Sequence, residues 1–105
     1  MRGGTGLYII QMGVTGDFKV GRSEDVERRL SELQTGSPHK LKVLLFAPGL
    51  GHLERSVHRT LRKYRCRYGK GEWFRESGFG QIPDQLYNLF SAEVLEAADW
   101  WKPTR

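Results

Sequence analysis

Apolar and polar positions follow strand and helix periods along most of the chain. Residues 6–12 (GLYIIQM) and 18–21 (FKVG) are short apolar runs of the kind that form strands. Residues 13–17 between them carry the glycines of a tight turn, so the two runs predict a β-hairpin. Residues 41–47 (LKVLLFA) are almost continuously apolar, which predicts a third and mostly buried strand.

Helical spacing of apolar residues predicts three helices. Ser23 is the expected N-cap of the first, which runs to about Leu33. The buried stripe of this helix follows the i, i+4, i+7 pattern and consists of Val26, Leu30 and Leu33. A second helix is expected from about Leu50 to Tyr64, and a third, amphipathic one over about 82–98.

The length and composition predict one small domain that spans residues 1–105. A chain of 105 residues buries roughly 60–70% of its unfolded surface, which is enough for one modest core. No apolar run approaches the ~18–20 residues of a membrane span, and the first residues lack a signal-peptide core. Cys66 is the only cysteine, so a reducing, intracellular and cytoplasmic setting is the simplest expectation.

The net charge of +5 is concentrated in one segment of the chain. Between His52 and Arg75 there are eight basic residues and only two acidic ones, Glu54 and Glu72. Such a stripe favours a polyanionic partner, because each neutralised phosphate releases condensed counterions. The alternative is an ordinary solvated helix face.

Several motifs in a fixed order resemble the GIY-YIG endonuclease superfamily. The first is Gly6-Leu7-Tyr8, the second is Lys19-Val20-Gly21, and Arg29 follows eight residues after Gly21. Glu54, on the next predicted helix, resembles the metal-binding glutamate of that family. Three further stretches are similar to a phage and bacterial branch often labelled as a DNA-binding domain, namely RLSELQTGSP (29–38), LERSVHRTL (53–61) and GEWF (71–74).

This resemblance, which covers about residues 6–74, implies a fold and a chemistry. The fold would be α+β, a small three-stranded antiparallel sheet flanked by helices, with a core over about residues 6–75. Tyr8 would orient or deprotonate the attacking water, and Arg29 would bind the scissile phosphate. Glu54 would hold one divalent cation, Mg²⁺ or Mn²⁺.

The resemblance has two departures from the usual family pattern. Lys19 stands where tyrosine is more common, and it could contact phosphate or transfer a proton. The segment Glu72-Trp73-Phe74 lies where many members present an asparagine. Trp73 and Phe74 could stack on bases, although a role in the core is the stronger expectation.

A wider set of polar residues is predicted to contact nucleic acid. It comprises Arg22, His39, Lys40, Arg55, His58, Arg59, Arg62, Arg65, Arg67 and Lys70. For His39 and His58, an ordinary surface or structural role is the competing interpretation.

The sequence therefore predicts a Mg²⁺-dependent endonuclease that hydrolyses phosphodiester bonds in single- or double-stranded DNA. The alternative is a non-catalytic nucleic-acid-binding module with the same fold, and an RNA-directed nuclease is a third possibility. The resemblance implies a bacterial or phage context, and a domain of this size is expected to need a second copy of the chain or a specificity partner to choose its sites.

Overall fold

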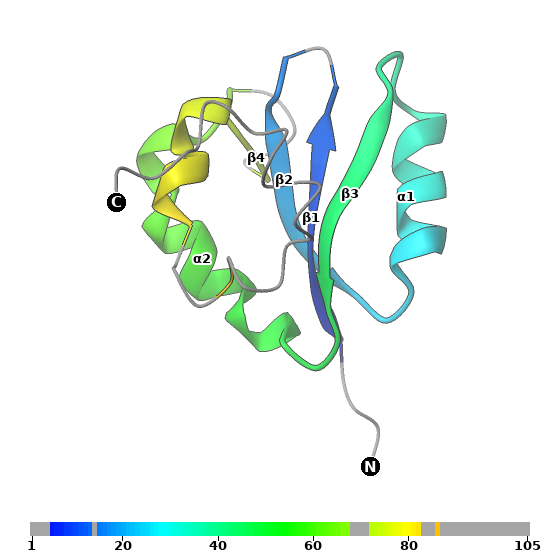
Figure 1. Cartoon of the computed structure of the whole chain (residues 1–105), viewed down its shortest axis with the longest axis horizontal. Helices are drawn as coiled ribbons and strands as arrows, with labels where there is room; N and C mark the ends of the chain where they lie inside the picture. The colour runs from blue at the N-terminus through cyan, green and yellow to red at the C-terminus, as the bar shows by residue number, and fades with distance from the viewer. Residues whose placement is uncertain (1–4, 14, 68–71, 83–85, 87–105) are drawn as a thin grey trace.

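The computed structural model describes residues 5–13, 15–67, 72–82 and 86. Its centre is a four-stranded antiparallel sheet in the order β3-β1-β2-β4. The strands are β1 (Gly6–Met12), β2 (Phe18–Ser23), β3 (Leu41–Ala47) and β4 (Trp73–Phe74). Figure 1 shows β1 between β2 and β3 at the centre of the sheet, and residues on both of its faces are buried.

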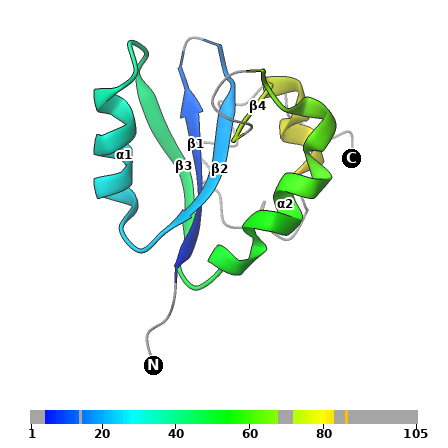
Figure 2. The same cartoon turned by 180° about the vertical axis from the view of Figure 1, so that it is seen from behind.

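Helical segments cover both faces of the sheet. Helix α1 (Val26–Thr35) packs on one face and α2 (Glu54–Thr60) on the other, as the two opposite views show (Figures 1 and 2). Helix α2 lies between two short 3-10 helices, η1 (Gly51–Leu53) and η2 (Arg62–Tyr64). Another 3-10 helix, η4 (Glu76–Gln81), follows β4.

The alternation of side chains along the strands divides the core into two clusters. Leu7, Ile9, Phe18 and Val20 point toward α2 and η4, where they pack with Val57, Leu61, Phe74 and Phe79. Tyr8, Ile10 and Met12 point the other way, where Val26, Leu30 and Leu33 of α1 cover them. The predicted stripe of α1 therefore does face the sheet, although its residues are only partly buried.

The expectation of three strands was wrong, because Trp73 and Phe74 form a fourth. They pair with Lys19 and Phe18, respectively. Two residues are too few to produce a detectable strand period, so the sequence indicated only that these aromatics return to the core. Strand β2 also continues two residues beyond the predicted end at Gly21.

Two predicted features of the helices also differ from the structure. The N-cap of α1 is Asp25 rather than Ser23, because the Asp25 carboxylate accepts a hydrogen bond from the Arg28 amide at 3.1 Å. The predicted continuous helix 50–64 is divided into η1, α2 and η2, although its apolar spacing is retained. The predicted helix over 82–98 falls almost entirely outside the described residues.

The described helices include none that is long and apolar enough to cross a membrane. The residues after β4 instead add to the core. Phe79 is fully buried, and its ring contacts the edge of Phe18 at a centroid distance of 5.2 Å.

We expect Phe79→Ala to lower the free energy of unfolding by about 3–5 kcal/mol, because it leaves a cavity between β2 and η4. Denaturant unfolding measures this loss. Gly80→Ala is the matched control, since a methyl group there meets no atom within 4 Å. A Phe79→Ala protein as stable as the control would contradict the assignment of η4 to the core.

Candidate functional site

Tyr8, the tyrosine of the first motif, lies opposite Gly21, the glycine of the second motif. Tyr8 is opposite Gly21 in the β1–β2 ladder, and its side chain is 1% exposed. A Cβ atom added to Gly21 would lie 2.4 Å from the Tyr8 hydroxyl oxygen. Only glycine therefore leaves room for the ring in this position, and the pairing fixes where the hydroxyl group lies.

Arg29 reaches the same hydroxyl group from α1. Its Nε atom donates a hydrogen bond to Tyr8 Oη at 3.4 Å, and its Nη1 atom lies 3.3 Å from a Glu32 carboxylate oxygen. The hydrogen bond to Tyr8 is the main cause that raises the pKa of Arg29, so the guanidinium stays charged. Its side chain is 38% exposed, which leaves part of this charge accessible to an incoming anion.

Lys19 lies on the same face of the sheet as Tyr8 and is 2% exposed. Its ammonium group forms an ion pair with the Glu72 carboxylate, which precedes β4 and is half exposed. Lys19 is the main cause that lowers the pKa of Glu72, with burial opposing and the charges of Arg29 and His58 adding to the effect. The carboxylate therefore lies among several cations.

Glu54 lies on α2, on the opposite face of the sheet from Tyr8, next to the part of the β2 edge that β4 does not cover. Strand β4 pairs only with Phe18 and Lys19, so it does not cover Val20 to Arg22. His58 of α2 uses this edge and donates from Nε2 to the Val20 carbonyl oxygen at 2.6 Å. The Glu54 carboxylate lies 3.5 Å from Arg22 Nε and 3.9 Å from His58 Nε2.

Electrostatics connects these two layers at Tyr8. Burial is the main cause that raises the pKa of Tyr8 above its ordinary value of 10.0, and Arg29 opposes the shift. The charges of Glu72 and Glu54 raise this pKa further, so both carboxylates act on the hydroxyl group. Tyr8 and Arg29 are thus in contact, while Glu54 acts on them across the edge without a hydrogen bond to either in the described part of the chain.

A basic groove of about 530 Å³ leads to this cluster. Its lining consists of Glu54, Arg55, His58, Arg59, Arg62, Arg65 and Glu72. Five of the ten predicted nucleic-acid contacts therefore share one surface.

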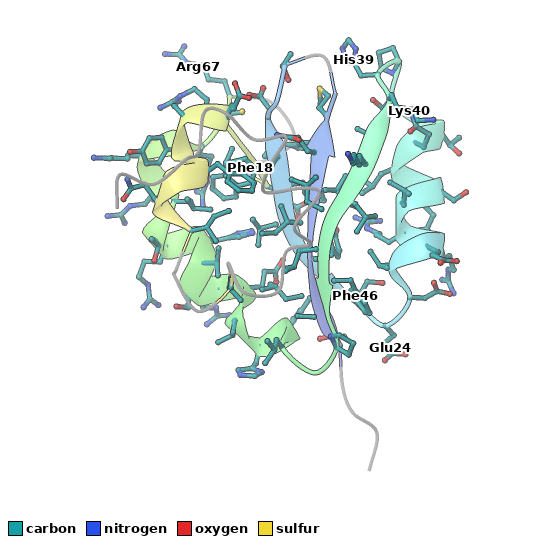
Figure 3. All side chains as sticks on the ribbon, in the orientation of Figure 1. Phe18, Glu24, His39, Lys40, Phe46 and Arg67 are labelled. Carbon is teal, nitrogen blue, oxygen red and sulfur yellow. The ribbon has the colours of Figure 1, made fainter. Side chains whose placement is uncertain are left out.

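The remaining predicted contacts lie elsewhere. Arg22 flanks Glu54, whereas Arg67 is exposed and outside the lining of the groove. His39 and Lys40 lie before β3, at the other end of α1 from Glu24 (Figure 3). Lys70 lies outside the described residues.

No role was predicted from the sequence for Glu72, which the structure brings into contact with Lys19. The available signal was weak, since it amounted to one carboxylate ahead of an aromatic pair in a basic segment. The pairing of β4 with β2 brings Glu72 to Lys19, and that pairing was not predicted.

Glu54 has donor chemistry that suits a hard divalent cation. Its carboxylate is partly exposed in the groove, and its ion pairs with Arg22 and His58 in the described part of the chain are long, at 3.5 and 3.9 Å. Mg²⁺ retains most of its waters, so one protein carboxylate together with phosphate oxygens is an adequate ligand set. The described residues contain no group of three or more metal-ligating side chains.

We expect the raised pKa of Tyr8 to appear in the pH dependence of stability. Its contribution is complete below the unfolded pKa near 10.0 and is lost as pH rises through the higher folded value. Tyr8→Phe should therefore lose less stability than the wild type above pH ~10. Denaturant unfolding at several pH values, with ultraviolet titration of tyrosinate, measures both effects.

The control for that experiment is Tyr64→Phe, which removes a tyrosine outside the cluster and should retain the late-ionising Tyr8. Complete ionisation of all tyrosines at their ordinary pKa in the folded protein would contradict the buried position of Tyr8.

Comparison with known proteins agrees with a link to nucleic acids. No curated protein and no solved structure is significantly similar to the chain. The model of a family described as the T5orf172 domain, which is phage-associated, matches residues 5–102. That match suggests a role related to nucleic acids. The match extends over nearly the whole chain, which therefore belongs to the T5orf172 domain family.

Proposed function

We propose that the chain is a metal-dependent endonuclease that hydrolyses phosphodiester bonds in DNA, with a site like that of GIY-YIG enzymes. The observation that carries the proposal is the Tyr8–Arg29 contact at 3.4 Å, next to the buried Lys19 and within electrostatic range of Glu54. A phenol, two cations and an acid from separate elements suit a reaction at a phosphate group.

Arg29 is the group best suited to hold the scissile phosphate. Its Nε atom is engaged by Tyr8 and one terminal nitrogen by Glu32, which fixes the plane of the guanidinium group. Its remaining N–H groups can donate to phosphate oxygens and stabilise the charge that develops in the transition state. Lys19 adds a second positive charge on the same face.

Tyr8 acts on the attacking water as a neutral phenol at neutral pH, because burial and both carboxylates raise its pKa. Its oxygen accepts a hydrogen bond from Arg29 and can still orient a water molecule. Neutralising the charge of Glu54 would lower the pKa of Tyr8 and so favour the tyrosinate, the only form of this side chain that could accept a proton from water.

Glu54 would hold a Mg²⁺ or Mn²⁺ ion, which when bound supplies Lewis-acid stabilisation of the phosphate oxygens. Arg22, 3.5 Å away, partly neutralises the carboxylate and can contact the DNA backbone. His58 is held by the Val20 carbonyl group, so it fixes the position of α2 against β2 next to the site.

We expect Arg29→Ala to lower the cleavage rate about 10²–10³-fold, the typical effect of losing one donor to a developing negative charge. The measurement is cleavage of single- and double-stranded DNA with Mg²⁺ or Mn²⁺. Arg28→Ala is the matched control, because Arg28 is adjacent in sequence but 77% exposed and turned toward Glu32. Equal rates for the two variants would exclude the proposed role of Arg29.

Glu54→Ala should abolish metal-dependent cleavage, while Glu24→Ala, which removes an exposed carboxylate two residues before α1, should not. The test monitors product formation as Mg²⁺ is titrated. Cleavage that survives Glu54→Ala would remove the proposed metal site.

The second candidate is a binding module that retains the fold without chemistry. The basic groove favours it directly, because its four arginines suit a phosphate backbone whether or not cleavage follows. The complete set of Tyr8, Lys19, Arg29 and Glu54 favours catalysis, since Glu54 without a cation would only repel phosphate. Salt-sensitive binding without cleavage would support the module, and an RNA substrate tests the third alternative.

Replacing Arg59 and Arg62 with alanine should weaken DNA binding and reduce the salt slope by about one for each lost phosphate contact. Binding measured at several salt concentrations tests this expectation. Lys42→Ala, which removes an exposed cation from β3 outside the groove, should leave the slope unchanged.

A further inference from the structure

A second groove lies on the α1 face of the sheet and differs in chemistry from the basic groove. It measures about 590 Å³, a volume within the range of small-ligand sites. Its apolar lining includes Met12, Leu33, Pro38 and Trp73. No lysine or arginine is found among the described residues that line it.

Trp73 connects this groove to the candidate site. Consecutive residues of a strand face opposite sides, and here they have different environments. Phe74 is fully buried against Phe18, with ring centroids 5.8 Å apart, so it cannot stack on a ligand. Trp73 is only partly buried, lines the groove and lies opposite Lys19 in the ladder.

Glu32 provides a second connection at the wall formed by α1. It lines the groove, and one carboxylate oxygen lies 3.3 Å from Arg29 Nη1. The groove and the Tyr8–Arg29 pair therefore share a boundary. A phosphate bound by Arg29 would have the groove beside it.

The charges in the groove do not suit a phosphate but do suit a nucleobase. Glu32 is paired with Arg28 and Arg29, and Asp17 accepts a hydrogen bond from the Glu76 amide. These oxygens can still accept from exocyclic amino groups, while the apolar walls and Trp73 suit the faces of a heteroaromatic ring. The groove offers a negatively charged backbone no lysine or arginine among the described residues that line it.

We propose that this groove receives one unpaired nucleobase next to the phosphate bound by Arg29. The adjacency to the cut rests on the proposed function, whereas the base site itself rests on the groove. Because a base in a regular duplex is stacked and paired, the preferred substrate is single-stranded or locally unpaired DNA. The basic groove, on the other layer, would hold the phosphate backbone of the same strand.

An abasic scan of single-stranded DNA bound to the wild-type protein tests the base site. Binding is measured in a chelator, so that no cleavage occurs. We expect removal of one particular base to weaken binding about 5- to 100-fold, the usual contribution of one base stacked on an aromatic ring. Uniform affinity at every abasic position would overturn the proposal without requiring any variant.

The variant Trp73→Leu tests whether the base identified by the scan binds in this groove. It should weaken binding of the intact single strand by a similar factor, abolish the abasic effect and leave duplex binding almost unchanged, whereas Trp73→Phe should retain part of the affinity. Non-additivity of the base deletion and the tryptophan deletion is the signature of direct contact. Equal losses for single strand and duplex, or an abasic effect that survives in Trp73→Leu, would overturn the assignment.

The result can be separated from the nuclease proposal. Base-dependent binding by a protein that never cleaves DNA would retain the base site and reject catalysis. Cleavage that depends on Glu54 but does not change with the abasic position would support catalysis and reject the base site.

Discussion

The pairing of Tyr8 with Gly21 is the constraint on which the candidate site depends. The antiparallel register places the phenol ring over the one residue of β2 that has no side chain to displace it. A shift of the β1–β2 register by one residue would turn Tyr8 to the other face of the sheet, away from Lys19 and Arg29. The hairpin turn holds this register, with Gly16 at a φ of 81° and Gln11 donating a hydrogen bond to its carbonyl group. Local turn chemistry therefore positions a hydroxyl group several residues away.

The shortness of β4 is the second constraint. A longer strand would cover the edge of β2, and α2 could not bring Glu54 and His58 close to a site on the opposite face. Because the pairing ends at Lys19, the Val20 carbonyl group is left for His58, and β4 does not cover the edge of β2 beyond Lys19. The same two-residue strand brings Glu72 to Lys19 and Trp73 to the α1 face. One abbreviated element thus connects the two layers of the protein.

These two constraints differ in how far they could be predicted from sequence. Residues 6–12 and 41–47 form strands with the predicted bounds, because long apolar runs bounded by turn residues are strong local signals. The order of the motifs also predicted that Tyr8 and Arg29 lie in one site, and the structure shows them in contact. The fourth strand, the Asp25 cap and the division of helix 50–64 depend on tertiary pairing or on competition between adjacent polar residues, which no local pattern resolves. The role of Glu72 could not be predicted for the same reason, since it depends on Lys19, which is 53 residues away in the sequence.

The distribution of charge accounts for two grooves around one cluster. On the α2 side, arginines outnumber acids and the surface suits a phosphate backbone. On the α1 side, apolar residues, the ion-paired Glu32 and the hydrogen-bonded Asp17 form a surface that suits an uncharged ring. The boundary between them is the Lys19–Glu72 pair and the adjacent Trp73. Lys19 offsets the charge of Glu72 at this boundary, so a backbone in the basic groove can reach it without facing an uncompensated carboxylate. A strand that bends at this point would direct its phosphate toward Arg29 and its base toward the groove on the α1 side.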